Sequence, residues 1–267
     1  PKDNLHYGGW EHRSIHNVFG LTYHEATYSS LIKRLLGTEV ERPFILTRSF
    51  FAGSQRTSAM WTGDNMSKWE YLKTSIPMVL TMGVLGMPFA GADIGGFFGN
   101  PLKQLLTRWY QTGVFYPFMR AHAHIDSRRR EPWVPGEPYT SIIRDAITLR
   151  YSLLPIIYTA FYDASQTGLP VIKPLFYETP ENPESYSIDD EFFIGDSGIL
   201  VKPVTEEDAK TVKTYIPDNS RYYYFNEGII NGKYISKKGY YEEGVKLETI
   251  PMFLKGGSIV FKKERYR

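Results

Sequence analysis

Hydrophobic positions along the first two thirds of the chain alternate between helical spacing and short apolar runs. Apolar residues three and four positions apart predict helices over residues 16–36, over 67–81, from Pro101 onward, and over 139–166. The short apolar runs predict strands at residues 43–48, 58–61, 87–91 and 114–118. The pattern therefore predicts four strands that alternate with helices.

Proline and glycine mark features of the predicted helices. Gly168 is a typical helix stop, and Thr140 or Ser141 is the expected N-cap of the last helix. Pro77 and Pro155 lie inside predicted helices, where the missing N–H donor is expected to bend the helix axis.

Strands that alternate with helices are typical of a parallel sheet, because each return to the sheet requires a crossover. In a (β/α)8 barrel the loops after the strands form the active face, and here those loops hold most of the polar and glycine residues. A whole barrel needs about 250 residues and eight strands. The predicted fold class is therefore α/β, with the C-terminal half of a (β/α)8 TIM barrel over residues 1–168.

The pattern changes from residue 169 onward, where helical spacing stops and short β-rich runs lie between turns. Such runs occupy residues 198–201, 221–225 and 258–261. Turn-forming residues occur at 217–219, 231–232 and 256–257. We therefore predict a small all-β sandwich domain over residues 169–267.

Composition narrows the possible functions. The chain has 267 residues with 42% hydrophobic and 22% charged residues, so a packed core is expected and disorder is not. The net charge of +2 argues against a nucleic acid or an anionic membrane as partner. The absence of cysteine excludes disulfides and thiolate metal sites. The longest apolar stretch, residues 76–90, is too short and too interrupted by proline and glycine to span a bilayer.

Three segments carry candidate chemistry. In the first, Asp64 follows a glycine, and Trp61 lies three residues earlier. A neighbouring aromatic surface favours the neutral form of a carboxylic acid, which the acid catalyst of a glycosidase requires. Spacing alone instead favours Asp64 as a cap of the helix that begins near Ser67. In the second segment, F-A-G-A-D-I-G-G-F, Asp93 lies in a glycine-rich loop at a strand end, where a simple turn is the alternative. The glycine spacing is not that of a phosphate loop.

The third segment, F-M-R-A-H-A-H-I-D, contains two histidines without a partner at zinc-site spacing, so we expect no metal there. The following arginines at 128–130 are expected to form a solvated face or a set of structural ion pairs. The acidic run 189–191 suggests calcium only weakly, because its spacing is wrong for an EF-hand loop. The segment 7–17 mixes ionisable groups with a Trp and a Gly pair, and helix capping and a substrate-loop role are both open.

Four motifs, T-R-S-F-F-A-G-S-Q-R, W-T-G-D-N, G-A-D-I-G-G-F and F-M-R-A-H, occur in the order and spacing of the family 31 α-glucosidases, which the chain resembles over nearly its whole length. H-Y-G-G-W-E-H-R and R-A-H-A-H-I-D resemble the endoplasmic-reticulum members more than the lysosomal or intestinal ones. The resemblance implies the following roles: Asp64 as general acid/base, Arg48 and His122 as partners of the sugar hydroxyls, Asp93 as a carboxylate that orders this network, and Trp61 and Phe97 as aromatic walls of the pocket.

The resemblance also implies a retaining exo-α-glucosidase that trims α-linked glucose from N-linked glycans in the endoplasmic-reticulum lumen, without cofactor or metal and with a non-catalytic β subunit as partner. The nucleophile motif of the family, Trp-x-Asp-Met-Asn, is absent from this sequence. Both chain ends look cut, so we expect the nucleophile shortly before Pro1, on the remaining N-terminal part of the catalytic subunit. The chain alone is therefore expected to be inactive. A non-catalytic carbohydrate-binding scaffold and another family 31 specificity are the alternatives.

Overall fold

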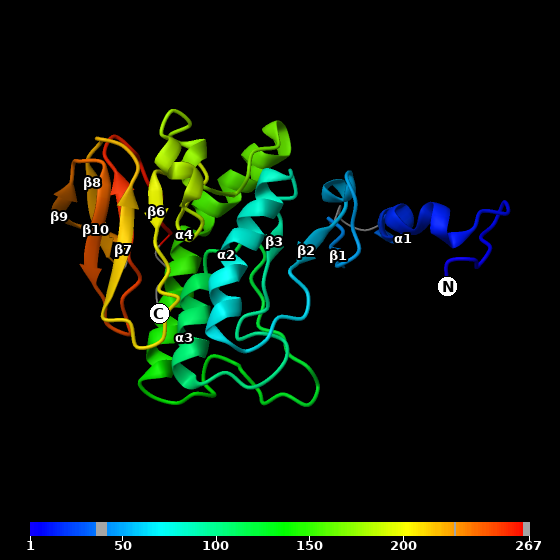
Figure 1. The fold of residues 1–267 in the computed structure, drawn as a ribbon, viewed down its shortest axis with the longest axis horizontal. Helices are drawn as coiled ribbons and strands as arrows, with labels where there is room; N and C mark the ends of the chain where they lie inside the picture. The colour runs from blue at the N-terminus through cyan, green and yellow to red at the C-terminus, as the bar shows by residue number, and fades with distance from the viewer. Residues whose placement is uncertain (36–41, 227, 264–267) are drawn as a thin grey trace. The chain divides into compact units, whose positions relative to one another are not determined.

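The computed structural model describes residues 1–35, 42–226 and 228–263. The contacts divide the chain into two compact units, Pro1–Trp61 and Thr62–Arg267. Figure 1 labels the helices and strands in chain order. Within the described ranges, no helix has both the length and the apolarity needed to cross a bilayer.

The first unit combines one long helix with a short pair of parallel strands. Its elements are α1 (His12–Leu35), β1 (Leu46–Thr47), the 3-10 turn η1 (Ser54–Arg56) and β2 (Ala59–Trp61). The helix and both strands were predicted, although β1 is shorter than the apolar run that indicated it. The buried imidazole of His24 on α1 hydrogen-bonds to Ser54 Oγ and to Thr57 Oγ1, each at 2.9 Å. These bonds tie α1 to the turn between the strands.

The second unit begins with three helices and a short strand. They are α2 (Trp69–Val84), β3 (Ala90–Gly91), α3 (Lys103–Gly113) and α4 (Tyr139–Thr167). The predicted helices are confirmed, and α4 ends at Gly168, whose φ of 77° is the left-handed conformation typical of a glycine stop. The predicted cap of α4 is wrong. Pro138 is the N-cap, and Ser141 already lies in the first turn, where its N–H donates to the Glu137 carboxylate at 3.3 Å.

The strand predicted at residues 114–118 is also wrong over residues 114–117, which continue the end of α3 as turns. Parallel pairing begins only at Phe118, whose N donates to Ala90 O at 3.0 Å, and continues at the Asp93–Arg120 bridge. Val114 N donates to Tyr110 O, and Tyr116 N donates to Gly113 O, both at 3.0 Å. The partly buried guanidinium of Arg150 on α4 donates to Val114 O at 2.6 Å and to Tyr116 O at 2.8 Å. Carbonyls satisfied in this way do not need a neighbouring strand, so a buried apolar run forms a turn here.

Two antiparallel sheets follow α4. The larger has six strands in the order β4-β5-β6-β11-β8-β9, and the smaller pairs β10 with β7. The strands of the larger sheet are β4 (Ile172–Lys173), β5 (Phe192–Ile194), β6 (Ile199–Val201), β8 (Tyr222–Asn226), β9 (Ile229–Ile235) and β11 (Met252–Lys255). Those of the smaller sheet are β7 (Thr211–Ile216) and β10 (Gly239–Gly244), and two 3-10 turns, Leu175–Tyr177 and Pro183–Ser187, lie between β4 and β5.

Figure 1 shows the labelled strands β6 to β10 on one side of α3 and α4, and the six-stranded sheet packs into a hydrophobic core on each of its faces. Successive residues on its central strands point to opposite faces, because side chains alternate along a strand. On β5, Phe192 and Ile194 pack with residues of α2, α3 and α4, whereas Phe193 packs with Tyr215 and Ile216 of β7. One hydrophobic core therefore joins the helices to the sheet, and a second joins the sheet to β7.

The strand predicted at residues 258–261 is wrong, and the strand lies earlier, at β11. The residues of β11 fill both cores, whereas Ile259 is 80% exposed and Phe261 is 74% exposed. After the turn at residues 256–257 the chain leaves the sheet, and Lys263 N donates to Ser152 O of α4 at 2.9 Å. Two consecutive glycines end the strand, so the apolar residues after them do not continue it.

Candidate active site

Three loops of the second unit carry most of the predicted site residues. They run over residues 62–67 before α2, over 92–99 after β3, and over 119–126 after the turn that follows α3. Backbone hydrogen bonds join each loop to the next. Phe97 N donates to Asn65 O at 2.6 Å, and His124 N donates to Phe97 O at 3.0 Å. Segments far apart in the sequence therefore meet in one place.

Two glycines make this close approach possible. A Cβ atom on Gly91 would lie 1.8 Å from Phe118 O, and one on Gly96 would lie 2.7 Å from the Met66 backbone. Gly96 also has a φ of +79°, in the region that favours glycine. The glycines of the segment F-A-G-A-D-I-G-G-F are thus required by backbone packing between neighbouring loops.

Asp93 is the buried carboxylate of the site. Its Oδ1 accepts from Arg120 Nη2 at 2.7 Å and from Arg120 Nε at 3.0 Å, and its buried Oδ2 has no hydrogen-bond partner among the described residues. Burial raises the pKa of Asp93, Arg120 opposes this rise, His122 also lowers the pKa, and Asp64 raises it. Asp64 and His122, on the two neighbouring loops, therefore both influence the pKa of Asp93.

Asp64 lies on the first of these loops with its side chain exposed. The N-cap of α2 is Lys68, and the helix begins at Trp69. The alternative prediction, in which Asp64 caps this helix, is therefore wrong. An exposed carboxyl group beside a buried, charge-sensitive one is an arrangement that suits proton exchange with a bound substrate.

Aromatic rings from two loops form a wall next to these carboxyl groups. The rings of Phe97 and His122 stack with centroids 5.5 Å apart and planes 27° apart. The His124 ring meets the edge of Phe97 at 5.6 Å and lies 5.4 Å from Phe98. Two predicted site residues, Phe97 and His122, are thus in direct contact.

Arg48 and Trp61 lie in the first unit. The guanidinium of Arg48 lies 5.9 Å from the centroid of the Trp61 ring, a cation–π distance. The turn after Arg48 is closed by buried Ser54, whose Oγ accepts from Phe51 N at 3.0 Å. The structure therefore brings these two predicted residues together, and separately brings together Asp64, Asp93, Phe97 and His122.

Comparisons with known proteins match both parts of the chain. Residues 1–160 match the glycosyl hydrolases family 31 TIM-barrel domain, and residues 168–260 match the glycosyl hydrolase family 31 C-terminal domain. The chain belongs to glycosyl hydrolase family 31. The α/β class, with a TIM-barrel-type domain followed by a C-terminal domain, is therefore confirmed, as is the predicted family.

The family 31 relatives are several times longer than this chain. The Glucosidase 2 subunit alpha of Schizosaccharomyces pombe is 50% identical over 266 residues, which are 100% of this chain and 28% of the relative. A Glc1Man2-bound crystal structure of a glucosidase II alpha subunit has a TM-score of 0.91 and 57% identity, and covers 96% of this chain and 28% of that chain.

A third similar structure is a crystal structure of an ER glucosidase II heterodimeric complex, which consists of a catalytic subunit and the binding domain of a regulatory subunit. It has a TM-score of 0.91 and 58% identity, and covers 96% of this chain and 28% of that chain.

Sequence analysis missed two arginines of this family 31 site. Arg120 lies in the motif F-M-R-A-H. Because a buried carboxylate needs a cationic partner, the sequence could have indicated Arg120 as the partner of Asp93. The run 128–130 was expected to form a solvated face or structural ion pairs. Arg128 and Arg129 are exposed, and Arg129 Nη1 lies 3.3 Å from Glu131 Oε1. Arg130 fits neither expectation, because it is 4% exposed and donates to backbone carbonyls. No local signal distinguishes the third arginine from the other two.

The acidic run at residues 189–191 has a different role from calcium binding. Lys202 Nζ lies 2.6 Å from Asp190 Oδ2 and 3.3 Å from Glu191 Oε1. Burial raises the pKa of Glu191 to about 8, with Lys202 acting against the rise. The Lys202 ammonium therefore pairs with the Asp190 carboxylate and lies next to Glu191. Across the described ranges, no group of three or more His, Asp or Glu side chains is placed to hold a metal ion.

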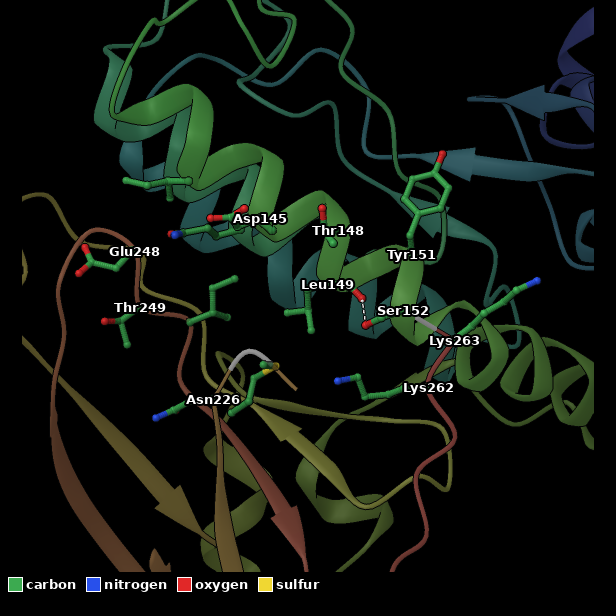
Figure 2. A pocket seen from close by; sticks show the side chains of 15 residues that line it. Asp145, Thr148, Leu149, Tyr151, Ser152, Asn226, Glu248, Thr249, Lys262 and Lys263 are labelled. Carbon is green, nitrogen blue, oxygen red and sulfur yellow. Dashed lines mark hydrogen bonds between the residues drawn. The ribbon is translucent and has the colours of Figure 1, made fainter. Parts of the chain in front are cut away.

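A cavity of about 530 Å³ lies elsewhere in the second unit, beside α4. Figure 2 shows its lining, with Asp145 and Tyr151 from α4, Glu248 from the loop before β11, and Lys262 from the end of the chain. None of the predicted site residues lines it. The site described above is therefore a set of loops on one side of the helices and not this cavity.

Proposed function

We propose that this chain supplies the general acid/base, Asp64, and part of the sugar pocket of a retaining exo-α-glucosidase. The observation that carries the proposal is the electrostatic coupling of Asp64, Asp93 and His122 on three interlocked loops. Family 31 membership and the 50% identity to a Glucosidase 2 subunit alpha support it. Because the chain spans 28% of that relative, the activity belongs to the longer protein.

The proposed chemistry is a double displacement. In the first step the Asp64 carboxyl gives its proton to the glycosidic oxygen, while a second carboxylate attacks the anomeric carbon and the leaving sugar departs. In the second step the Asp64 carboxylate takes a proton from water, and the resulting hydroxyl displaces the enzyme carboxylate with net retention. We propose that the attacking carboxylate lies in the part of the relatives that this chain does not span, about 5–5.5 Å from Asp64.

The remaining residues would hold the sugar. Asp93, kept in place by Arg120, orders the hydrogen bonds to the hydroxyl groups, and His122 and Arg48 bind hydroxyls directly. Trp61 and Phe97 form apolar walls against which a sugar ring can pack. A charged carboxylate that accepts from hydroxyls binds them more strongly than a neutral one, so the ion pair with Arg120 matters for the site.

The proposed architecture is the C-terminal half of a (β/α)8 barrel over residues 1–168 and a β-sandwich domain over 169–267. The predicted boundary between 168 and 169 stays a prediction. Short strands and interlocked loops on one side support the half barrel, since the active loops of a barrel lie at one end of its strands. The other half would come from the remaining N-terminal part of the catalytic subunit.

We propose α-linked glucose on N-linked glycans as the substrate, the endoplasmic-reticulum lumen as the location, and a non-catalytic β subunit as a partner. The Glc1Man2-bound structure, which contains glucose and mannose, supports the substrate. The heterodimer of a catalytic subunit with the binding domain of a regulatory subunit supports the location and the partner.

The test uses the full-length protein with Asp64→Ala and, as a matched control, Asp189→Asn at an exposed aspartate outside the site. We expect Asp64→Ala to lower turnover of a glucosyl disaccharide by about 10²–10⁴-fold, since general acid–base catalysis contributes that much. Turnover of an aryl glucoside with a good leaving group should fall less in its first step, because that leaving group needs no proton.

Azide identifies the role of the residue. It attacks the glycosyl-enzyme without a general base, so adding it to Asp64→Ala should release α-glucosyl azide with retained configuration. Turnover of the disaccharide at the rate of Asp189→Asn would contradict the proposal and favour a carbohydrate-binding scaffold instead.

A further inference from the structure

Arg130 is a buried cation whose side chain reaches the loop that carries Phe97. Its Nη1 donates to Gly96 O, and its Nη2 donates to Gly99 O at 3.1 Å. The residue is 4% exposed, so these bonds replace contacts with water. Hydrogen bonds from a charged donor to buried carbonyls are among the stronger ones in proteins.

The loop held by Arg130 is also hydrogen-bonded to the loop before α2: Ser67 Oγ donates to Gly95 O at 2.7 Å, and Ser67 N donates to Phe98 O at 2.8 Å. Gly95, Gly96 and Gly99 all have φ values near +80°, at +86°, +79° and +85°, and none has a side chain to pack. A Cβ on Gly95 would lie 3.3 Å from Arg130 Nη1, so a side chain at this position would press against the guanidinium. Glycine allows this conformation but does not hold it, because glycine has the largest conformational freedom. The guanidinium adds a constraint at the carbonyls of Gly96 and Gly99.

The backbone of Arg130 is fixed as well. The hydroxyl of Tyr110, a buried residue of α3, donates to Arg130 O at 2.9 Å. Burial raises the pKa of Tyr110 to about 12, so it stays a donor across the working pH range. The backbone of Arg130 is therefore bound to α3, and its side chain is bound to the glycine-rich loop 95–99.

Phe97 lies inside the loop that Arg130 grips, between the two carbonyls that accept its hydrogen bonds. The Phe97 ring stacks on His122 with centroids 5.5 Å apart. A loop that shifted by one ångström would break this stacking and move both rings relative to the carboxyl groups.

We propose that Arg130 is a positioning residue for sugar binding, which fixes loop 95–99 so that Phe97 and His122 form one wall of the glucose pocket. The inference rests on the proposed function and adds a residue to it. Arg130 acts through Phe97 and does not touch the sugar, so its loss should change substrate binding more than the chemical step.

The experiment compares Arg130→Gln and Arg130→Lys in the full-length protein with Arg129→Gln, the exposed neighbour in the same run. For Arg130→Gln we expect KM for a glucosyl disaccharide, and the inhibition constant of glucose, to rise about tenfold, with kcat within about threefold of wild type. Arg130→Lys keeps one charged donor and should recover part of the loss. Arg129→Gln should match wild type.

A double variant separates positioning from general destabilisation. If Arg130 acts through Phe97, the double variant Phe97→Ala with Arg130→Gln should have the KM of Phe97→Ala alone. A KM that rises by the product of the two single effects would overturn the proposal, as would a KM and a glucose inhibition constant for Arg130→Gln equal to those of Arg129→Gln.

Tyr110→Phe offers a milder probe should both Arg130 variants fail to fold. It removes one hydrogen bond from the Arg130 backbone, so we expect a smaller KM increase in the same direction, and an unchanged KM would overturn the proposal. Absence of α-glucosidase turnover in the wild-type protein would instead refute the proposed function, so the two failures are distinguishable.

Discussion

At the scale of single residues, the buried charges of the candidate site are compensated by specific polar partners. Asp93 pairs with Arg120, and Arg130 donates to two loop carbonyls. Burying a charge is unfavourable unless a partner compensates for the lost water, so these pairs set the ionisation of the site. Ionisation at the site is therefore sensitive to single substitutions.

The clearest residue-scale prediction concerns pH. Arg120 is the main influence that keeps the pKa of Asp93 from rising further on burial. In full-length Arg120→Gln that influence is lost, so the pKa of Asp93 rises and its carboxylate is protonated at higher pH. We expect the acid limb of the kcat/KM profile to move to higher pH, with activity at neutral pH reduced about tenfold or more.

The control for this pH profile is Arg128→Gln, which changes an exposed arginine near the same loops. Its acid limb should coincide with that of the wild-type protein. An unshifted acid limb in Arg120→Gln would show that Asp93 is not required in its charged form.

At the scale of elements, buried arginines join segments that local sequence patterns do not connect. Arg150 satisfies the carbonyls after α3, which is why residues 114–117 form turns. Arg108 on α3 donates to Lys246 O at 2.8 Å and to Thr249 O at 2.9 Å, and so holds the loop before β11 against the helix. The sheet and the helices are thus linked by charge-assisted hydrogen bonds as well as by their shared core.

Removing this link should weaken the second unit. Burial lowers the pKa of Arg108 to about 10, so the group is still charged at neutral pH. Arg108→Met removes both charge-assisted hydrogen bonds to the Lys246 and Thr249 carbonyls, and we expect a loss of about 2–4 kcal/mol of stability. Differential scanning calorimetry of the full-length protein should show a lower midpoint for Arg108→Met. Arg144→Met, an exposed arginine of α4, should stay within about 0.5 kcal/mol of wild type, and equal midpoints for both variants would contradict the proposed link.

At the scale of the whole molecule, the second unit is a layered structure whose outer surfaces are unequally covered. The central strands β5 and β6 are buried, but the edge strand β9 is exposed, and one side of α4 exposes large aromatic side chains. Tyr158 is 68% exposed and Tyr162 is 62% exposed, one helical turn apart. A row of exposed aromatic residues on a helix is typical of a surface that another segment covers.

The corresponding prediction is that these 267 residues do not form an active enzyme alone. Expressed by themselves, they should be inactive on α-glucosides, because the attacking carboxylate is missing, and should unfold without a cooperative transition, because strand edges and helix faces lack their partners. Circular dichroism on heating and a turnover assay provide the measurements. Co-expression with the N-terminal remainder of the full-length protein is the control that should restore both properties. A soluble monomer with a sharp transition would contradict the first expectation, and unaided turnover would contradict the second.

The sequence by itself determined the features that depend on neighbours along the chain. Helical spacing predicted α1, α2, α3 and α4, and the motifs identified Asp64, Asp93, Phe97 and His122, which the structure places on interlocked loops. Periodicity and turn chemistry are local properties, so they can be deduced from short windows.

Tertiary structure alone decided the features that depend on distant partners. Arg150 satisfies the carbonyls of the turn after α3, and Arg120 influences the pKa of Asp93. Arg130 is buried because its guanidinium donates to Gly96 O and Gly99 O, which lie 34 and 31 positions earlier in the sequence. Whether a charged or apolar residue is exposed or buried depends on the groups that surround it in the folded protein. Those groups come from segments that only the folded chain brings together.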